Sequence, residues 1–339
     1  MKSEHQLDET VPTREQIDKM YALAKRVLDI SPWEFMVELQ ILAVQHSAED
    51  TSFLIVTGAM GEYFSVQIYS SFHDLDAMLR LDEGSHQDMV DIMFGMPQLK
   101  LVFAKANELL PGDRERIKAS GIAFKKGKNP SLQSMMPGYD NCFPGGRELD
   151  RMAACIEQLL FMLEGGQTIP EISSPMDPIC TRVCREGGWE QEMKSHPLLH
   201  PEPDLSVSEE LLNQVLGLPR RDRSMACGCF VIPTRFREKG RRPTVPRACM
   251  LMDVESQFII GMELLVPEPG KLWNIAAALD TILKKFVTLG FRPSRLRVNG
   301  PLLQEVGEQF CTMIDVDYDE RHFQPMLQAF DEIMSRLGC

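Results

Sequence analysis

Residues 247–266 read RACMLMDVESQFIIGMELLV, two apolar runs separated by the polar turn Glu255-Ser256-Gln257. Short apolar runs bounded by turn residues are typical of strands, and a short polar turn joins two of them into a β-hairpin. This hairpin decides the fold class of the C-terminal part of the chain, because the pattern that follows it alternates between helix and strand.

Downstream of the hairpin, apolar residues recur at helical spacing over residues 271–289, up to Gly290. Strand RLRV, a helix over 301–310, strand TMIDVDY and a last helix near 323–337 follow. Strands that alternate with helices of this length imply right-handed crossovers and a largely parallel region. With CFVIP (229–233) as a first strand, the order is β-β-β-α-β-α-β-α, which is that of the RNase H-like fold.

The N-terminal half predicts a separate α+β domain over residues 12–165. A capping-box pattern at Thr13 and Gln16 opens its first helix, strands and short helices follow, and a long amphipathic helix ends at Gly165-Gly166. KKGKNPSLQSMMPGYDNCFPGG is interpreted as a loop. The Pro-rich segment 166–247 is interpreted as a connecting region with short strands. The α/β domain then covers 248–337, with 227 as an alternative start.

The composition bounds the class of protein. The chain has 339 residues, 44% of them hydrophobic, which favours two globular domains. Its charged N-terminus is not a signal peptide, and no apolar run is long enough for a membrane span. Nine scattered cysteines suit a reducing cytoplasm, and a net charge of −13 disfavours general adhesion to nucleic acid or anionic membrane.

Residues 179–200 contain Cys180, Cys184, His196 and His200 in a C-x3-C-x11-H-x3-H pattern that resembles a zinc finger. Pro197 lies between the histidines, so a regular helix carrying both is disfavoured. The first part also reads as a strand, a Gly-Gly turn and a second strand. We therefore predict no metal site here, and no cofactor.

A basic stretch covers residues 219–247, where nine Arg or Lys stand against two acids, a local net charge of +7. It could bind phosphates, or it could be a solvated loop that balances the acidic remainder of −20 (−13 − 7). The candidate binding residues are Arg220, Arg221, Arg235, Arg237, Arg241 and Arg242.

Carboxylates are the third candidate site. Asp253 ends the first strand of the hairpin, Glu263 lies in the second, and Asp315 lies in TMIDVDY. Two-metal nucleases of the RNase H-like fold need acids that converge on two Mg²⁺ ions. The expected first strand CFVIP carries no acid, and Asn299 stands where the fourth strand would need an Asp. Cross-strand pairing of Asp315 and Asp317 with Arg295 and Arg297 of strand RLRV explains these acids without catalysis.

Three segments together, PGDRERIKASGIAFKKGKNP, MMPGYDNCFP and RRPTVPRACMLMDVES, are similar to an uncharacterised bacterial family built from two consecutive domains of unknown function. The resemblance covers residues 15–165 and 240–335. Some relatives add a C-terminal SEC-C zinc motif; this sequence ends in SRLGC, so that zinc function is not implied. The resemblance implies no catalytic residues.

The sequence therefore predicts a cytoplasmic, non-catalytic binding or interaction protein, with a protein partner favoured over nucleic acid and no membrane association. Two alternatives stay open. One is a metal-dependent nuclease-like phosphoryl-transfer enzyme that uses Asp253, Glu263 and Asp315. The other is a nucleic-acid adaptor that binds through the basic stretch 219–247.

Overall fold

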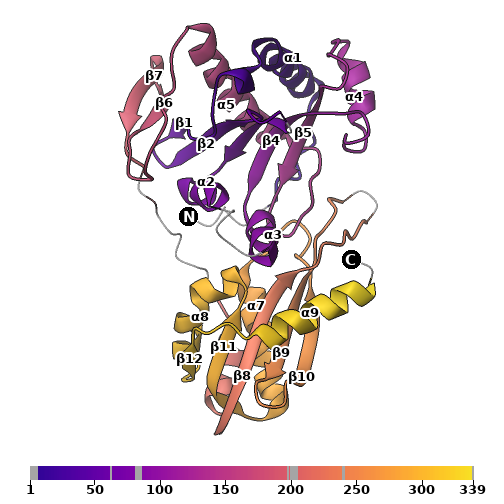
Figure 1. The fold of residues 1–339 in the computed structure, drawn as a ribbon, viewed down its shortest axis with the longest axis vertical. Helices are drawn as coiled ribbons and strands as arrows, with labels where there is room; N and C mark the ends of the chain where they lie inside the picture. The colour runs from indigo at the N-terminus through magenta and orange to yellow at the C-terminus, as the bar shows by residue number, and fades with distance from the viewer. Residues whose placement is uncertain are drawn as a thin grey trace.

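A computed structural model describes residues 7–61, 63–80, 86–196, 198, 205–238 and 241–337. These residues form two α/β domains, each built on one mixed sheet (Figure 1). The N-terminal domain carries a seven-stranded sheet and the C-terminal domain a five-stranded sheet. No helix of the described residues is long and apolar enough to cross a membrane.

The first sheet has the strand order β5-β4-β3-β2-β1-β6-β7. Neighbouring strands are antiparallel except for β1 and β6, which are parallel. The strands are β1 (Leu42–Ser47), β2 (Asp50–Thr57), β3 (Phe64–Tyr69), β4 (Gln98–Ala104), β5 (Asn129–Met135), β6 (Ile179–Arg185) and β7 (Gly188–Lys194).

Helices α1 (Arg14–Ile30) and α5 (Gly146–Glu164) bury their apolar faces on one side of this sheet, and α2 (Phe72–Leu79) covers part of the other. The predicted capping box opens α1. The Gln16 amide N–H donates to Thr13 Oγ1 at 3.2 Å, and the Thr13 N–H donates to Gln16 Oε1 at 2.8 Å. The first domain also contains the 3₁₀ helix Pro32–Glu34, α3 (His86–Gly95) and α4 (Asp113–Ser120).

The second sheet has the order β10-β9-β8-β11-β12. Strands β8, β9 and β10 are antiparallel, whereas β8, β11 and β12 run parallel. The predicted hairpin is confirmed as β9 and β10. The strands are β8 (Arg220–Val231), β9 (Arg247–Asp253), β10 (Ile259–Leu265), β11 (Arg292–Asn299) and β12 (Asp317–Asp319).

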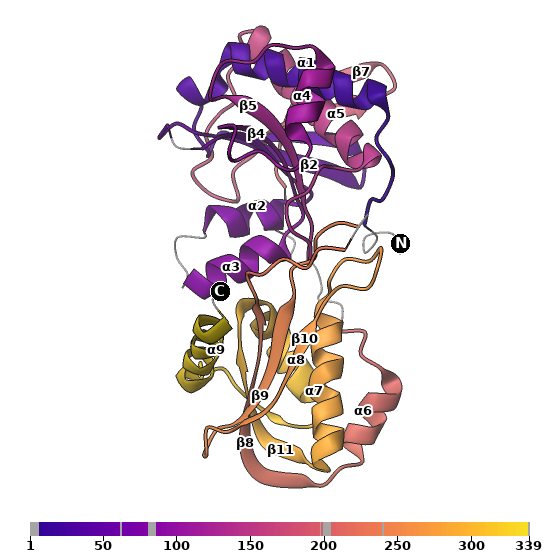
Figure 2. The ribbon, with the colours of Figure 1, turned by 90° about the vertical axis from the view of Figure 1, so that its right-hand side faces the viewer.

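Helices lie on both faces of this sheet (Figure 2). α7 (Ile275–Leu289) and α8 (Pro301–Met313) pack on one face, and α6 (Glu209–Leu216) packs against α7. α9 (Gln324–Leu337) covers the other face with Met326 and Phe330 in its core.

Three segments differ from the sequence-based expectation. Residues 129–135, interpreted as loop, form β5, which pairs with β4 along its whole length. The segment 166–247, expected to be a connecting region with short strands, contains strands β6, β7 and β8. The difference is that β6 and β7 complete the first sheet and thus belong to the first domain. TMIDVDY is mostly not a strand, because α8 continues to Met313 and Asp315 adopts a left-handed φ of 52°.

The two domains meet through α3, which packs against β8 and α8 of the second domain. Asp91 of α3 and Arg247 of β9 form an ion pair of 2.9 Å in which each side chain is only 1% exposed. Val231 also donates its N–H to Asp91 Oδ1 at 2.9 Å. A buried, hydrogen-bonded ion pair therefore joins the domains.

Candidate functional site

The three candidate acids lie apart, and each has its own cationic neighbour. Asp253 accepts hydrogen bonds from the Ser256 N–H and Oγ and lies 3.7 Å from Arg223. These bonds to Ser256 lower the pKa of Asp253 and explain the residue as a turn cap.

Glu263, in β10, lies 3.3 Å from Lys285 of α7. Asp315 follows α8, beside the opposite edge of the sheet, and pairs with Arg292 at 2.9 Å. Within the described ranges, no three His, Cys, Asp or Glu side chains are grouped so that they could hold a metal ion. The acids proposed for two-metal catalysis therefore do not converge.

The six candidate arginines lie in two separate places, because β8 separates them. Arg220 and Arg221 begin that strand, at the end of the second domain remote from the first (Figure 1). Arg220 pairs with Asp317 at 2.9 Å, and the Arg221 guanidinium stacks on Phe291, 4.7 Å from the ring centroid. Both thus contact their own domain.

The remaining four arginines follow β8 at its other end, near the first domain. Arg235 pairs with Asp140 of the first domain at 2.8 Å, and Arg241 pairs with Glu238 at 2.8 Å. Arg237 is exposed. The six arginines, all of them in the described part of segment 219–247, therefore form no continuous basic surface: one end of the segment belongs to the second domain and the other contacts the first.

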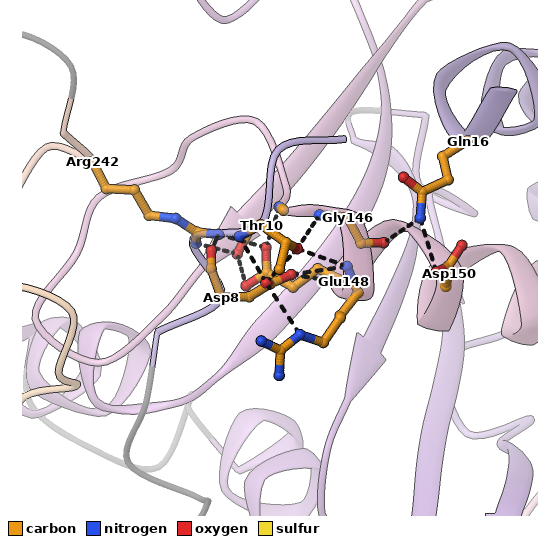
Figure 3. Close-up of polar contacts among 10 residues, drawn as sticks. Asp8, Thr10, Gln16, Gly146, Glu148, Asp150 and Arg242 are labelled. Atoms are coloured by element: carbon orange, nitrogen blue, oxygen red, sulfur yellow. Dashed lines mark hydrogen bonds and ion pairs between the residues drawn. The ribbon is translucent and has the colours of Figure 1, made fainter. Parts of the chain in front are cut away.

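Arg242 is central to a polar cluster at the start of α5 (Figure 3). Its guanidinium donates to Glu148 Oε2 at 2.7 Å, to the Asp8 carbonyl oxygen at 2.8 Å and to Ser134 Oγ at 2.9 Å. Burial is the largest single influence and lowers the pKa of Arg242, but the interactions with Glu148, Cys142 and Asp8 together exceed it, so the pKa is raised. This side chain therefore links β5, α5 and the N-terminal residue Asp8.

Asp8 and Thr10, which precede α1, complete this cluster by capping the N-terminus of α5. The N–H groups of Arg147 and Glu148 donate to Asp8 Oδ2 at 3.0 and 3.1 Å, and the Gly146 N–H donates to Thr10 Oγ1 at 2.9 Å. The first N–H groups of a helix have no partner within the helix, and carboxylates near them are stabilising. A side chain at Gly145 would collide with Asp8, since its Cβ would lie 2.4 Å from Oδ2.

Strands β6 and β7 form the hairpin that the Gly-Gly turn predicted; Cys180 and Cys184 lie on β6, and His196 follows β7. Cys180 is buried in the core, while Cys184 is exposed. His196 contacts Thr181 Oγ1 through Nε2 at 2.9 Å and packs edge-on against Phe53. His200 lies outside the described residues. The three described groups have separate environments, in keeping with the predicted hairpin.

One Cys–His contact was not evident from the sequence. Cys155 Sγ of α5 lies 3.9 Å from His46 Nε2 of β1. Burial raises the pKa of Cys155 to about 12 and lowers that of His46. A nucleophilic dyad needs an accessible thiolate, so this pair is part of the core.

An open cavity of about 490 Å³ lies in the first domain, between the 3₁₀ helix and the turn that joins β2 to β3. Trp33 and Phe64 line it, and the Lys128 ammonium lies 4.1 Å from the centroid of Phe64 and 5.0 Å from that of Trp33. Such a cation–π contact leaves the ammonium beside an apolar wall. The cavity can therefore hold an apolar group next to an anionic one.

Large apolar side chains are exposed around this cavity. Phe35 lines it and is 59% exposed; Met60, between the lining residues Ala59 and Gly61, is 91% exposed. Tyr63, Val37 and Leu39 are also exposed. We call the residues Phe35, Val37, Leu39, Met60 and Tyr63, with the cavity walls Trp33, Phe64 and Lys128, the apolar surface. Sequence reasoning missed it because its three segments are separated along the chain.

Two family models match consecutive stretches of the chain. The family model of a domain of unknown function, DUF7309, matches residues 18–179, and that of a second domain of unknown function, DUF6930, matches residues 211–336. The chain thus consists of two consecutive domains of unknown function, as the resemblance implied. No curated protein and no solved structure gives a significant match.

Proposed function

We propose that this is a non-catalytic binding protein whose first domain docks a protein partner on the apolar surface. The observation that carries the proposal is the cavity beside Trp33, ringed by exposed Phe35 and Met60. Contiguous exposed apolar patches on soluble proteins mark interaction sites, and aromatic side chains and methionine are enriched in protein interfaces.

The chemistry of the cavity indicates the kind of segment that would fit. An apolar side chain would bury its surface against Trp33 and Phe64, and a neighbouring carboxylate would face the Lys128 ammonium. Peptide recognition commonly combines one apolar anchor with a charge that fixes orientation. We therefore expect the partner to present an apolar residue beside an Asp, a Glu or a C-terminal carboxylate.

For the second domain we infer an RNase H-like architecture that serves as a scaffold. In support, the strand order β10-β9-β8-β11-β12 combines three antiparallel strands with two parallel ones, and helices follow in the predicted order. The separate ion pairs of Asp253, Glu263 and Asp315 support a non-catalytic role. All eight described cysteines are free thiols, which supports a cytoplasmic location.

The test is selection of peptides from a random displayed library on the immobilised full chain. Enriched peptides should share an apolar anchor next to an acidic group, and Phe35→Ser and Lys128→Ala should each weaken their binding at least tenfold, or about 1.4 kcal/mol. Met176→Ser is the matched control, because Met176 is also exposed but lies elsewhere. Peptides that bind Phe35→Ser as tightly as the wild type would refute the proposal.

A further inference from the structure

The edges of the two sheets differ in how they are protected from pairing with another strand. Natural proteins blunt such edges with charges, short strands or covering segments. β12 is three residues long and carries Asp317 and Asp319. β7 carries Glu190, Glu192 and Lys194. Beside β5, Cys142 forms a bridge with Ser134.

The fourth edge, β10, lacks these devices. It contains no Pro and no Lys, and its one charge, Glu263, faces Lys285 of α7. Among the described residues, β10 pairs with β9 alone. In Figure 2 this edge faces the viewer, between α7 and α9.

Apolar side chains are exposed on one face of this edge. Met262 and Leu264 are 40% and 50% exposed and pair with Met250 and Ala248 of β9, which belong to the core under α9. Val266 has the same parity along the chain and is also exposed. The core under α9 thus continues to an uncovered edge.

We propose that a second copy of this chain pairs with β10 in antiparallel fashion across a two-fold axis. The sequence of the strand is self-complementary in this arrangement. With Leu264 opposite Leu264 of the second copy, Met262 lies opposite Val266, so every exposed apolar side chain meets an apolar one. Glu263 lies opposite Leu265, which keeps the two acids from facing each other.

A second copy fits this edge better than an unrelated strand because the match repeats on both sides of the axis. Two-fold dimers with the same patch on both subunits are the commonest protein oligomers. The two five-stranded sheets would join into one continuous sheet. Each dimer would carry two apolar surfaces and bind a repetitive partner bivalently. The pairing itself does not depend on the proposed function.

Sedimentation velocity of the full chain, from low to several hundred micromolar, tests this inference. The wild type should show a concentration-dependent dimer, and Leu264→Lys should weaken self-association at least tenfold. Met193→Lys is the matched control, since Met193 is an exposed methionine on the edge strand β7. A wild type that stays monomeric throughout, or a dimer that Leu264→Lys leaves unchanged, would overturn the inference.

Disulfide trapping tests the register independently of stability. Opposed residues of antiparallel strands have Cα atoms about 4.5–5.5 Å apart, within the range that a disulfide spans. In a Cys184→Ser/Cys339→Ser background, Leu264→Cys should form a covalent dimer under mild oxidation and Glu263→Cys should not. Equal crosslinking of both variants would contradict this pairing.

Discussion

The ion pair between Asp91 and Arg247 gives the sharpest test of how the domains are joined. Asp91→Asn removes the negative charge but keeps an oxygen that can accept the Val231 N–H. Arg247, 1% exposed, would then carry a buried charge without its counter-ion. Removing one partner of a buried pair costs about 3–5 kcal/mol, because the remaining charge stays desolvated.

The second substitution separates the charge effect from packing. In Asp91→Asn/Arg247→Met both charges are gone, and the apolar Met side chain partly fills the space of the arginine. Arg247 stacks on Trp273, with its guanidinium 4.4 Å from the ring centroid, so some cation–π stabilisation is lost, about 0.5–2 kcal/mol. We expect the double variant to recover most of the free energy lost in Asp91→Asn.

The assay is urea unfolding followed by tryptophan fluorescence, because Trp273 lies against Arg247 and reports on this junction. The control is Lys19→Met, which breaks an exposed pair with Glu157 and should cost less than about 1 kcal/mol. The junction does not depend on this pair if Asp91→Asn lowers the free energy of unfolding no more than Lys19→Met does. The same conclusion holds if the double variant loses as much free energy as the single variants Asp91→Asn and Arg247→Met added together.

Three further outcomes are expected. Burial, with Lys194 nearby, lowers the pKa of His196 from 6.5 to about 4, so the folded protein takes up this proton at a lower pH than the unfolded chain. The free energy of unfolding should therefore fall as the pH drops from 6.5 to about 4, and it should fall less in His196→Asn. Urea unfolding at several pH values measures this, and an equal pH dependence in the two proteins would refute the prediction. Elemental analysis should find less than one equivalent of zinc per chain. Stoichiometric zinc that is lost in Cys180→Ser would instead support a zinc-finger site. DNA and RNA titrations should show no tight binding at physiological salt. The contrary result would be an affinity that falls by about 0.9 log units per phosphate contact for each log unit of salt and that is lost in Arg237→Glu/Arg241→Glu. That result would support the nucleic-acid adaptor instead.

Several elements could be predicted from the sequence because their signals are local. The capping box at Thr13 and Gln16, the hairpin around Ser256 and the amphipathic helices depend on residues a few positions apart. Periodicities of two and of 3.6 residues report which side of an element is buried, whatever it packs against. The two-domain organisation also followed, together with the resemblance to two domains of unknown function.

Strand β5 could not be predicted, because its sequence NPSLQSM shows neither apolar alternation nor a favourable composition. It exists because β4 offers a complete ladder of backbone partners. Likewise β6 joins the first sheet by pairing in parallel with β1, Cys180 opposite Leu42, although α5 and most of the domain lie between them in the chain. Pairing over such separations leaves no signal within a local window.

The candidate site was decided by the tertiary structure alone. The sequence determined that arginines gather in 219–247, but β8 carries them to opposite ends, where Asp317 and Glu148 neutralise two of them. The apolar surface combines Trp33, Met60 and Lys128, which come together only when strands β2 to β5 form one sheet. Local periodicity determines which residues are buried, whereas the partners of a charge and the walls of a cavity depend on long-range packing.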